Sequence, residues 1–276
     1  MFRQRVITAV VLLACLLALL LNLSPLNFSL VIVPIVLLAG SEWANLLTIK
    51  TRSRKIAYLA CLGLCLAISA LALDLFGTLD MQLGKYLALA ASVLWAIIFL
   101  WVQGYPSSAI LWSPQPILAV LGIVLLCFTW VAIALIIHQP HGPWLLLFAI
   151  VIVALADIGG YVAGNLFGKH KLAPVVSPGK TWEGFAGGMI LQCGLIAAVA
   201  PVLPSAIPLA ALVALVIPVA LYSVVGDLFE SMVKRHSGVK DSGHLLPGHG
   251  GVLDRIDGLM AALPLFILLF LLLSPL

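Results

Sequence analysis

The sequence predicts an all-α membrane protein, a polytopic bundle of about nine transmembrane helices with a cytoplasmic N-terminus. Of its 276 residues, 63% are hydrophobic and only 9% are charged, which is too little polar surface to cover a water-soluble globule. Runs of roughly 18 or more apolar residues recur along the chain, and each can cross a hydrocarbon core of roughly 30 Å as a helix. These runs are continuously apolar instead of alternating, which favours helices over a transmembrane barrel.

Polar residues and clusters of Pro and Gly mark the ends of the expected spans. In chain order, the spans are expected at about 6–23, 27–47, 56–74, 84–102, 116–137, 143–165, 184–203, 207–228 and 254–274. The first span follows Arg3 and Arg5 like a signal peptide, but the sequence after it, NLSPLN, lacks a small-residue cleavage site. We therefore expect this span to be a retained anchor.

The basic residues determine the expected orientation. With a cytoplasmic N-terminus and nine spans, all of the 14 Lys and Arg residues except Lys85 fall on the cytoplasmic side, as the positive-inside rule requires. An even number of spans would place one basic loop outside. The C-terminus is therefore expected outside. Small size and the lack of a targeting extension favour a bacterial inner membrane.

Chemistry is expected in the C-terminal half, because seven of the ten acidic residues lie between Asp157 and Asp257. We divide the chain into residues 1–140, a scaffold and candidate subunit interface, and residues 141–276, a catalytic region whose active site faces the cytoplasm. Within the spans of the first part, Glu42 stands almost alone as an ionisable residue. The longest non-apolar stretch, about 229–251, is too short for a separate soluble domain.

The five cysteines all lie in apolar runs without ligand spacing, so we interpret them as core residues and not as a metal or disulfide framework.

The first polar motif runs from Asp157 to Lys171. Asp157, Tyr161 and Asn165 share one helix face, and glycines at the same spacing form a second stripe, Gly160, Gly164 and Gly168. The glycines favour close helix packing in a membrane. A carboxylate within a span is costly, which makes Asp157 a functional candidate.

The second motif is the loop from Ser177 to Gly184, just before the seventh span. Its Gly-Lys-Thr triplet does not form a Walker phosphate-binding loop, because position 174 is Pro174 where the motif needs glycine. Lys180 beside Ser177, Thr181 and free backbone N–H groups near a helix start can still bind a phosphate. A topological anchor would explain Lys180 but not the whole polar cluster.

The third motif runs from Gly226 to Asp257. Asp227 and Ser231 fall one turn apart, with Lys234 and Arg235 a turn further, and Asp254 and Asp257 begin the ninth span. Carboxylates beside several cations suit a divalent metal with a polyphosphate. Orientation signals and helix-end charges explain the parts, but they do not explain why Asp241, His249 and the paired aspartates occur together.

In this third motif the sequence resembles the phosphatidate cytidylyltransferase family, also called CDP-diacylglycerol synthase. The family signature, S-x-x-K-R-x4-K-D-x-G-x2-[LIF]-P-x-H-G-G-x2-D-R-x-D, is met at every fixed position from Ser231 to Asp257. The first two motifs also resemble family features, except that Gly179 stands where many relatives carry lysine. In the N-terminal half the likeness is limited to hydropathy, span count and the Glu42-Trp43 pair.

The resemblance implies that CTP and phosphatidate react to give CDP-diacylglycerol and pyrophosphate, at the surface of the lipid bilayer and with no nucleic-acid partner. It implies a Mg2+ requirement, with room for K+ at an adjacent site, and a homodimer. The metal-binding role carries over to Asp227 and Asp254.

The attacking phosphate oxygen is already ionised near neutral pH, so positioning and charge neutralisation are expected to dominate over base catalysis. The expected catalytic residues are Asp227, Asp254, Lys234, Arg235, Lys240 and His249. The expected substrate-binding residues are Asp157, Ser177, Lys180, Thr181, Ser231, Asp241, Arg255 and Asp257.

Three other classes of protein fit the sequence less well. A transporter would show internal repeats and polar residues near the midplane, and the sequence shows neither. An alcohol phosphotransferase would carry a DG…AR…G…D…D pattern, which is absent. A purely structural subunit would leave the third motif unexplained.

Overall fold

The computed structural model describes the chain except residues 1, 50, 203–207, 244, 246–249 and 274–276. For residues 2–7 and 9 it describes the backbone only. The described part is almost entirely helical. Its long helices are α1 (Phe2–Asn22), α2 (Pro25–Leu46), α3 (Arg52–Ala72), α4 (Met81–Gln103), α6 (Gln115–Ile137), α7 (Gly142–Phe167), α8 (Trp182–Val199), α9 (Leu209–His236) and α10 (Leu253–Leu273).

Eight of these helices, α2 to α4 and α6 to α10, are long and apolar enough to cross a membrane, and α1 carries a shorter apolar stretch, Val10–Asn22. The polytopic all-helical prediction is confirmed, with α1 in the place of the first expected span. Local sequence explains several helix starts. The Ser24 and Asp80 side chains accept hydrogen bonds from Asn27 N (3.3 Å) and Leu83 N (2.9 Å), and so cap α2 and α4.

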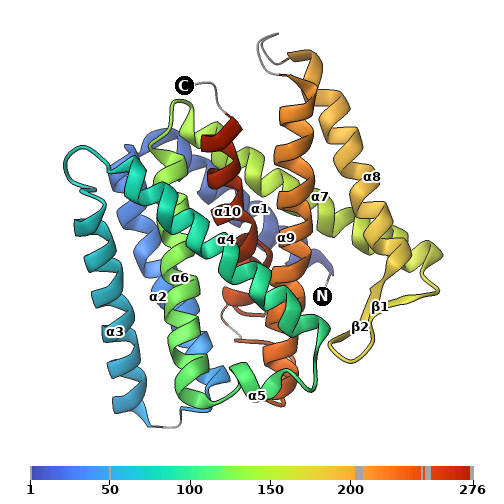
Figure 1. The fold of residues 1–276 in the computed structure, drawn as a ribbon, viewed down its shortest axis with the longest axis horizontal. Coiled ribbons are helices and arrows are strands. Elements are labelled where there is room, and N and C mark those ends of the chain that lie inside the picture. The colour runs from blue at the N-terminus through green and yellow to red at the C-terminus, as the bar shows by residue number, and fades with distance from the viewer. Residues whose placement is uncertain (1, 50, 203–207, 244, 246–249, 274–276) are drawn as a thin grey trace.

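Two short elements were not predicted. Residues Lys171–Ala173 (β1) and Ser177–Thr181 (β2) form an antiparallel hairpin, and Ala109–Trp112 form the short helix α5. Pro174 and Pro178 exclude a helix in the hairpin segment, and its strands lie outside the apolar spans. The hairpin extends from the bundle at one end (Figure 1).

Helix α9 also differs from expectation, because it continues to His236, well past the expected end of the span near residue 228. The extra turns are polar, and part of their charge is paired: Glu230 pairs with Lys234 one turn later, and basic residues in the last turn complement the helix dipole. As a result, Ser231, Lys234 and Arg235 are held on a rigid helix instead of a loop.

The bundle places α2, α3, α4 and α6 on one side and α7 and α8 on the other, with α9 and α10 between them (Figure 1). Within their apolar windows, α6 is 72% buried and α8 only 17%, so α8 lies at the periphery and relies on few neighbours. The division at residue 140 remains a prediction, although α9 and α10 pack directly against α4 and α6.

Glycines allow α7 and α8 to pack closely. A Cβ atom built on Gly159 would lie 2.6 Å from the carbonyl oxygen of Gly187, and one built on Gly184 would lie 2.6 Å from that of Gly160. Within the predicted stripe, a Cβ atom on Gly164 would lie 3.6 Å from Cα of Gly184, but one on Gly160 would meet only Gly184 O at 3.9 Å. Among the glycines of α7, the closest approach to α8 therefore falls on Gly159, which lies outside the stripe.

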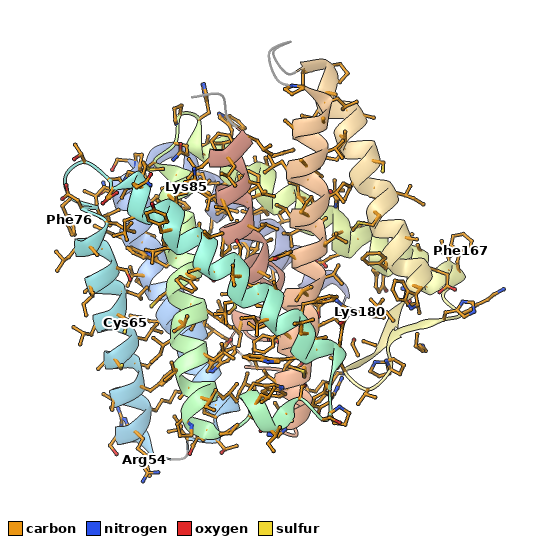
Figure 2. All side chains as sticks on the ribbon, in the orientation of Figure 1. Arg54, Cys65, Phe76, Lys85, Phe167 and Lys180 are labelled. Atoms are coloured by element: carbon orange, nitrogen blue, oxygen red, sulfur yellow. The ribbon has the colours of Figure 1, made fainter. Side chains whose placement is uncertain are left out.

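The two ends of the bundle carry residues that the expected orientation places on different sides of the membrane. Arg54 and Lys85 lie at opposite ends of the bundle (Figure 2). The hairpin and the C-terminal end of α9 lie at the same end as Arg54, and the end of α10 lies opposite (Figure 1).

Candidate functional site

A cavity of about 590 Å³ lies where the hairpin meets α7, α8, α9 and the start of α10. It brings together ten of the fourteen predicted site residues, although they are spread over a hundred positions of sequence. These ten are Asp157, Ser177, Lys180, Thr181, Asp227, Lys234, Asp241, Asp254, Arg255 and Asp257.

Helix α7 presents its predicted polar face to the cavity. Asp157, Tyr161 and Asn165 all line it, together with Gly160 and Gly164 between them. Asp157 lies close enough to the cations of Lys180 and Arg255 for electrostatic attraction. Its carboxylate lies close enough to those of Asp227 and Asp257 for mutual repulsion, which a bound cation would relieve.

The hairpin places the ammonium group of Lys180 beside α9. Nζ of Lys180, on β2, lies 2.6 Å from Oδ2 of Asp227, while Ser231 donates a 3.3 Å hydrogen bond to Oδ1. The Lys180 and Asp227 side chains remain 24% and 31% exposed, so both can reach a ligand in the cavity. The side chain of Thr181, next on the strand, caps α8 by accepting a hydrogen bond from Gly184 N at 3.1 Å.

A second, more deeply buried ion pair joins α9 to α10. Nζ of Lys234 lies 2.7 Å from Oδ1 of Asp254 and 2.6 Å from Oε2 of Glu230. Sequence reasoning missed Glu230, because this residue lies beyond the expected end of the span near residue 228; its place one turn before Lys234 was the available signal. Its other oxygen, Oε1, is buried without a partner among the described residues.

Backbone N–H groups also donate hydrogen bonds to the carboxylate of Asp254. Gly251 N donates a 2.8 Å hydrogen bond to Oδ2, and Ser242 N donates bonds of 3.1 and 3.3 Å to the two oxygens. Asp257, one turn later, accepts a hydrogen bond from Gly258 N at 2.8 Å. The segment before α10 therefore fixes the first carboxylate of the helix.

Three predicted residues within the described part of the chain do not line the cavity. Arg235 and Lys240 are exposed and absent from the lining, whereas Ser231 contacts it only through Asp227. His249 lies outside the described residues. The roles expected for all fourteen site residues remain predictions.

The lining is suited to a divalent cation and phosphate groups. Five aspartates and three basic side chains face the cavity, and hard carboxylate oxygens are the ligands that Mg2+ prefers. Among the described residues, no three His, Cys, Asp or Glu side chains are already gathered as a metal site. Asp227 and Asp254 each have one oxygen held by a lysine, so their lysines would have to yield to a bound ion or shift onto a phosphate.

Apolar groups complete the wall. Leu172, Phe185, Met189 and Val224 line the cavity beside the charged residues. A cavity of this composition can hold a molecule with both a charged phosphate end and an apolar end.

Comparisons with known proteins agree with this chemistry. The family model described as "Cytidylyltransferase family" matches residues 3–273. The phosphatidate cytidylyltransferase of Haemophilus influenzae is 39% identical over 281 aligned residues, which cover 96% of this chain and 97% of the relative. That of Pseudomonas aeruginosa is 40% identical over 269 residues, covering 96% of both chains. That of Staphylococcus saprophyticus is 49% identical over 129 residues, or 46% of this chain. Since the family model and two relatives span nearly the whole sequence, this chain belongs to the cytidylyltransferase family.

Proposed function

We propose that the chain transfers CMP from CTP to phosphatidate, giving CDP-diacylglycerol and pyrophosphate. The observation that supports this most directly is the cavity in which Lys180, Lys234 and Arg255 face five aspartates at one end of a transmembrane bundle. Such a site offers cations for phosphate groups and carboxylates for a metal, beside apolar groups for acyl chains. The reaction makes this protein a membrane nucleotidyltransferase of phospholipid biosynthesis.

In the proposed step, a phosphate oxygen of phosphatidate attacks the α-phosphorus of CTP, and the bond to pyrophosphate breaks. Lys180 lies on the hairpin and Lys234 on α9, and both line the cavity, so the two ammonium groups can neutralise phosphates bound there. Asp157 and Asp257, which line the same cavity, orient the substrate groups bound there. Phe185, Met189 and Val224 keep the acyl end of the lipid out of the polar part of the site.

Asp227 and Asp254 are the residues proposed to hold Mg2+. When bound, Mg2+ would neutralise phosphate charge. A K+ ion at an adjacent site, a homodimer, a bacterial inner membrane and a cytoplasmic active site are further parts of the proposal. The cationic hairpin and the basic end of α9, at the end of the bundle where Arg54 lies, support the cytoplasmic placement.

The test is pyrophosphate release by the purified protein in detergent, with CTP, phosphatidate and Mg2+ each omitted in turn. We expect release to need all three, and to fall about 10²-fold or more in Asp227→Asn and Asp254→Asn. Asp80→Asn is the matched control, because asparagine caps a helix as well as aspartate and Asp80 caps α4. A folded wild-type protein without release would refute the reaction and reopen the transporter hypothesis; full activity in either variant would refute that aspartate's role.

A further inference from the structure

Glu42, near the C-terminal end of α2, is a buried carboxylate that the proposed mechanism does not use. Its side chain belongs to the half of the chain that the sequence assigned to scaffold, and the residue is only 5% exposed. A charge at this depth is costly unless it is fully hydrogen-bonded. The hydrogen-bond partners of Glu42 therefore show which segment of the chain it stabilises.

Among the described residues, Glu42 accepts three hydrogen bonds, all from the segment that leads into α10. Val252 N donates to Oε1 at 3.0 Å, and Leu253 N donates to Oε2 at 2.8 Å. The hydroxyl of Ser242 also donates to Oε2, at 3.3 Å. The first N–H groups of a helix have no partner within it, and the N-terminal end of the helix dipole favours a negative charge. Glu42 is thus an N-terminal cap for α10 supplied by another helix.

The chain closes tightly around this carboxylate. A Cβ atom built on either Gly243 or Gly251 would lie 2.7 Å from Cδ of Glu42. Such contacts leave no room for a side chain at either position. A side chain at either position would therefore push the Glu42 carboxylate away from its hydrogen-bond donors.

The same short segments also hold Asp254. Gly251 N and Ser242 N donate to Asp254, while the neighbouring Val252 N and the Ser242 hydroxyl donate to Glu42. The segment is therefore fixed between a carboxylate from α2 and a carboxylate of the cavity. If this segment shifts at Glu42, the donors that hold Asp254 shift with it.

We infer that Glu42 is a positioning residue of the transferase: it fixes residues 242 and 251–253 against α2 and so sets the position of Asp254 in the cavity. This inference rests on the proposed function. It also gives the N-terminal half a part in the active site beyond that of a scaffold.

The chemistry of the contact suggests a discriminating variant. Both oxygens of Glu42 accept from a backbone N–H, whereas a glutamine has one acceptor oxygen and would turn its NH2 group toward the other donor. Glu42→Gln therefore keeps the size of the side chain but removes one of the two acceptors for these backbone N–H groups. Glu42→Asp keeps both acceptors at a shorter reach.

The matched control is Ser237→Ala. The Ser237 hydroxyl donates a 2.8 Å hydrogen bond to Leu46 O, so it also joins α2 to the C-terminal half but does not contact Asp254. Loss of a general contact between the two halves would affect both variants. Loss of positioning would affect only Glu42→Gln.

The experiment combines steady-state kinetics with hydrogen–deuterium exchange and thermal unfolding in detergent. For Glu42→Gln we expect kcat to fall about 10²-fold, since a shift of about 1 Å in a catalytic group can cost that much, with the KM for phosphatidate changed less than about two-fold. Exchange should accelerate only in peptides covering residues 250–256. Glu42→Asp should recover part of kcat, and Ser237→Ala should match the wild type.

A wild-type kcat in Glu42→Gln would overturn the inference. So would faster exchange throughout the helices with a lower melting temperature, because that result would mean a purely structural role. A wild-type protein without CMP transfer would refute the proposed function alone. In that case, faster exchange of Glu42→Gln confined to residues 250–256 would still support the contact by which Glu42 fixes the start of α10.

Discussion

Lys234 on α9 and Asp254 on α10 form an ion pair, with Nζ 2.7 Å from Oδ1, in which the side chains are only 12% and 6% exposed. Glu230, 3% exposed, shares the same ammonium group. One buried cation therefore serves two buried carboxylates. The two helices that carry most of the predicted site are joined at this point.

Removing that cation should damage both stability and activity. Lys234→Met leaves Glu230 and Asp254 buried without a counter-charge, which costs about 3–5 kcal/mol when one partner of a buried pair is lost. We expect a lower melting temperature in detergent and no measurable CMP transfer.

The double variant Lys234→Met/Glu230→Gln separates the two effects. Neutralising Glu230 should restore much of the melting temperature, while CMP transfer stays absent because the phosphate still lacks its cation. An unchanged melting temperature in the single variant would contradict the role of Lys234 as a shared counter-ion.

The Lys180–Asp227 pair should behave differently because both side chains are partly exposed. Lys180→Met should change the free energy of unfolding by no more than about 1 kcal/mol, as is typical of accessible ion pairs. We expect kcat/KM for CTP to fall about 10- to 100-fold through the loss of a phosphate-binding cation.

Lys171→Met is the control on the same hairpin, because Lys171 is exposed and does not line the cavity. Its kcat/KM should stay within about two-fold of the wild type. Equal losses in the two variants would indicate a diffuse electrostatic effect of the hairpin rather than a specific contact.

The packing of α7 against α8 predicts a contrast between two glycines. Gly159→Ala places a methyl group 2.6 Å from the Gly187 carbonyl oxygen and should cost about 1–3 kcal/mol through overpacking. Around Gly194, on the same helix pair, nothing lies within 4 Å of the added Cβ atom. Gly194→Ala should therefore be neutral or stabilise α8 by up to about 1 kcal/mol. Thermal unfolding in detergent measures both, and equal melting temperatures would contradict the packing.

The orientation can be tested with single cysteines in a background where the five native cysteines are replaced by alanine. Phe76 and Arg54 lie at opposite ends of the bundle (Figure 2). In bacterial spheroplasts, Phe76→Cys should react with a membrane-impermeant maleimide at once. Arg54→Cys should react only after the membrane is opened, and the reverse pattern would invert the proposed topology.

Much of this protein could be predicted from local sequence. The length and continuity of each apolar run decide whether a helix can cross a bilayer, so the spans follow from short windows of sequence. The glycine stripe of α7 and the paired aspartates of α10 were equally visible, because helix periodicity places residues on a face without reference to the rest of the fold.

The remaining features depend on contacts between distant parts of the chain. No local pattern indicates that Lys180 meets Asp227, or that Glu42 caps a helix beginning at Leu253, because such pairs form only when helices far apart in sequence pack together. The extension of α9 and the hairpin likewise depend on polar partners outside their own spans. The sequence by itself determined the membrane-spanning helices and the residue types of the site; only tertiary packing decided which charges face one another, because Coulomb and hydrogen-bond energies depend on distances between atoms.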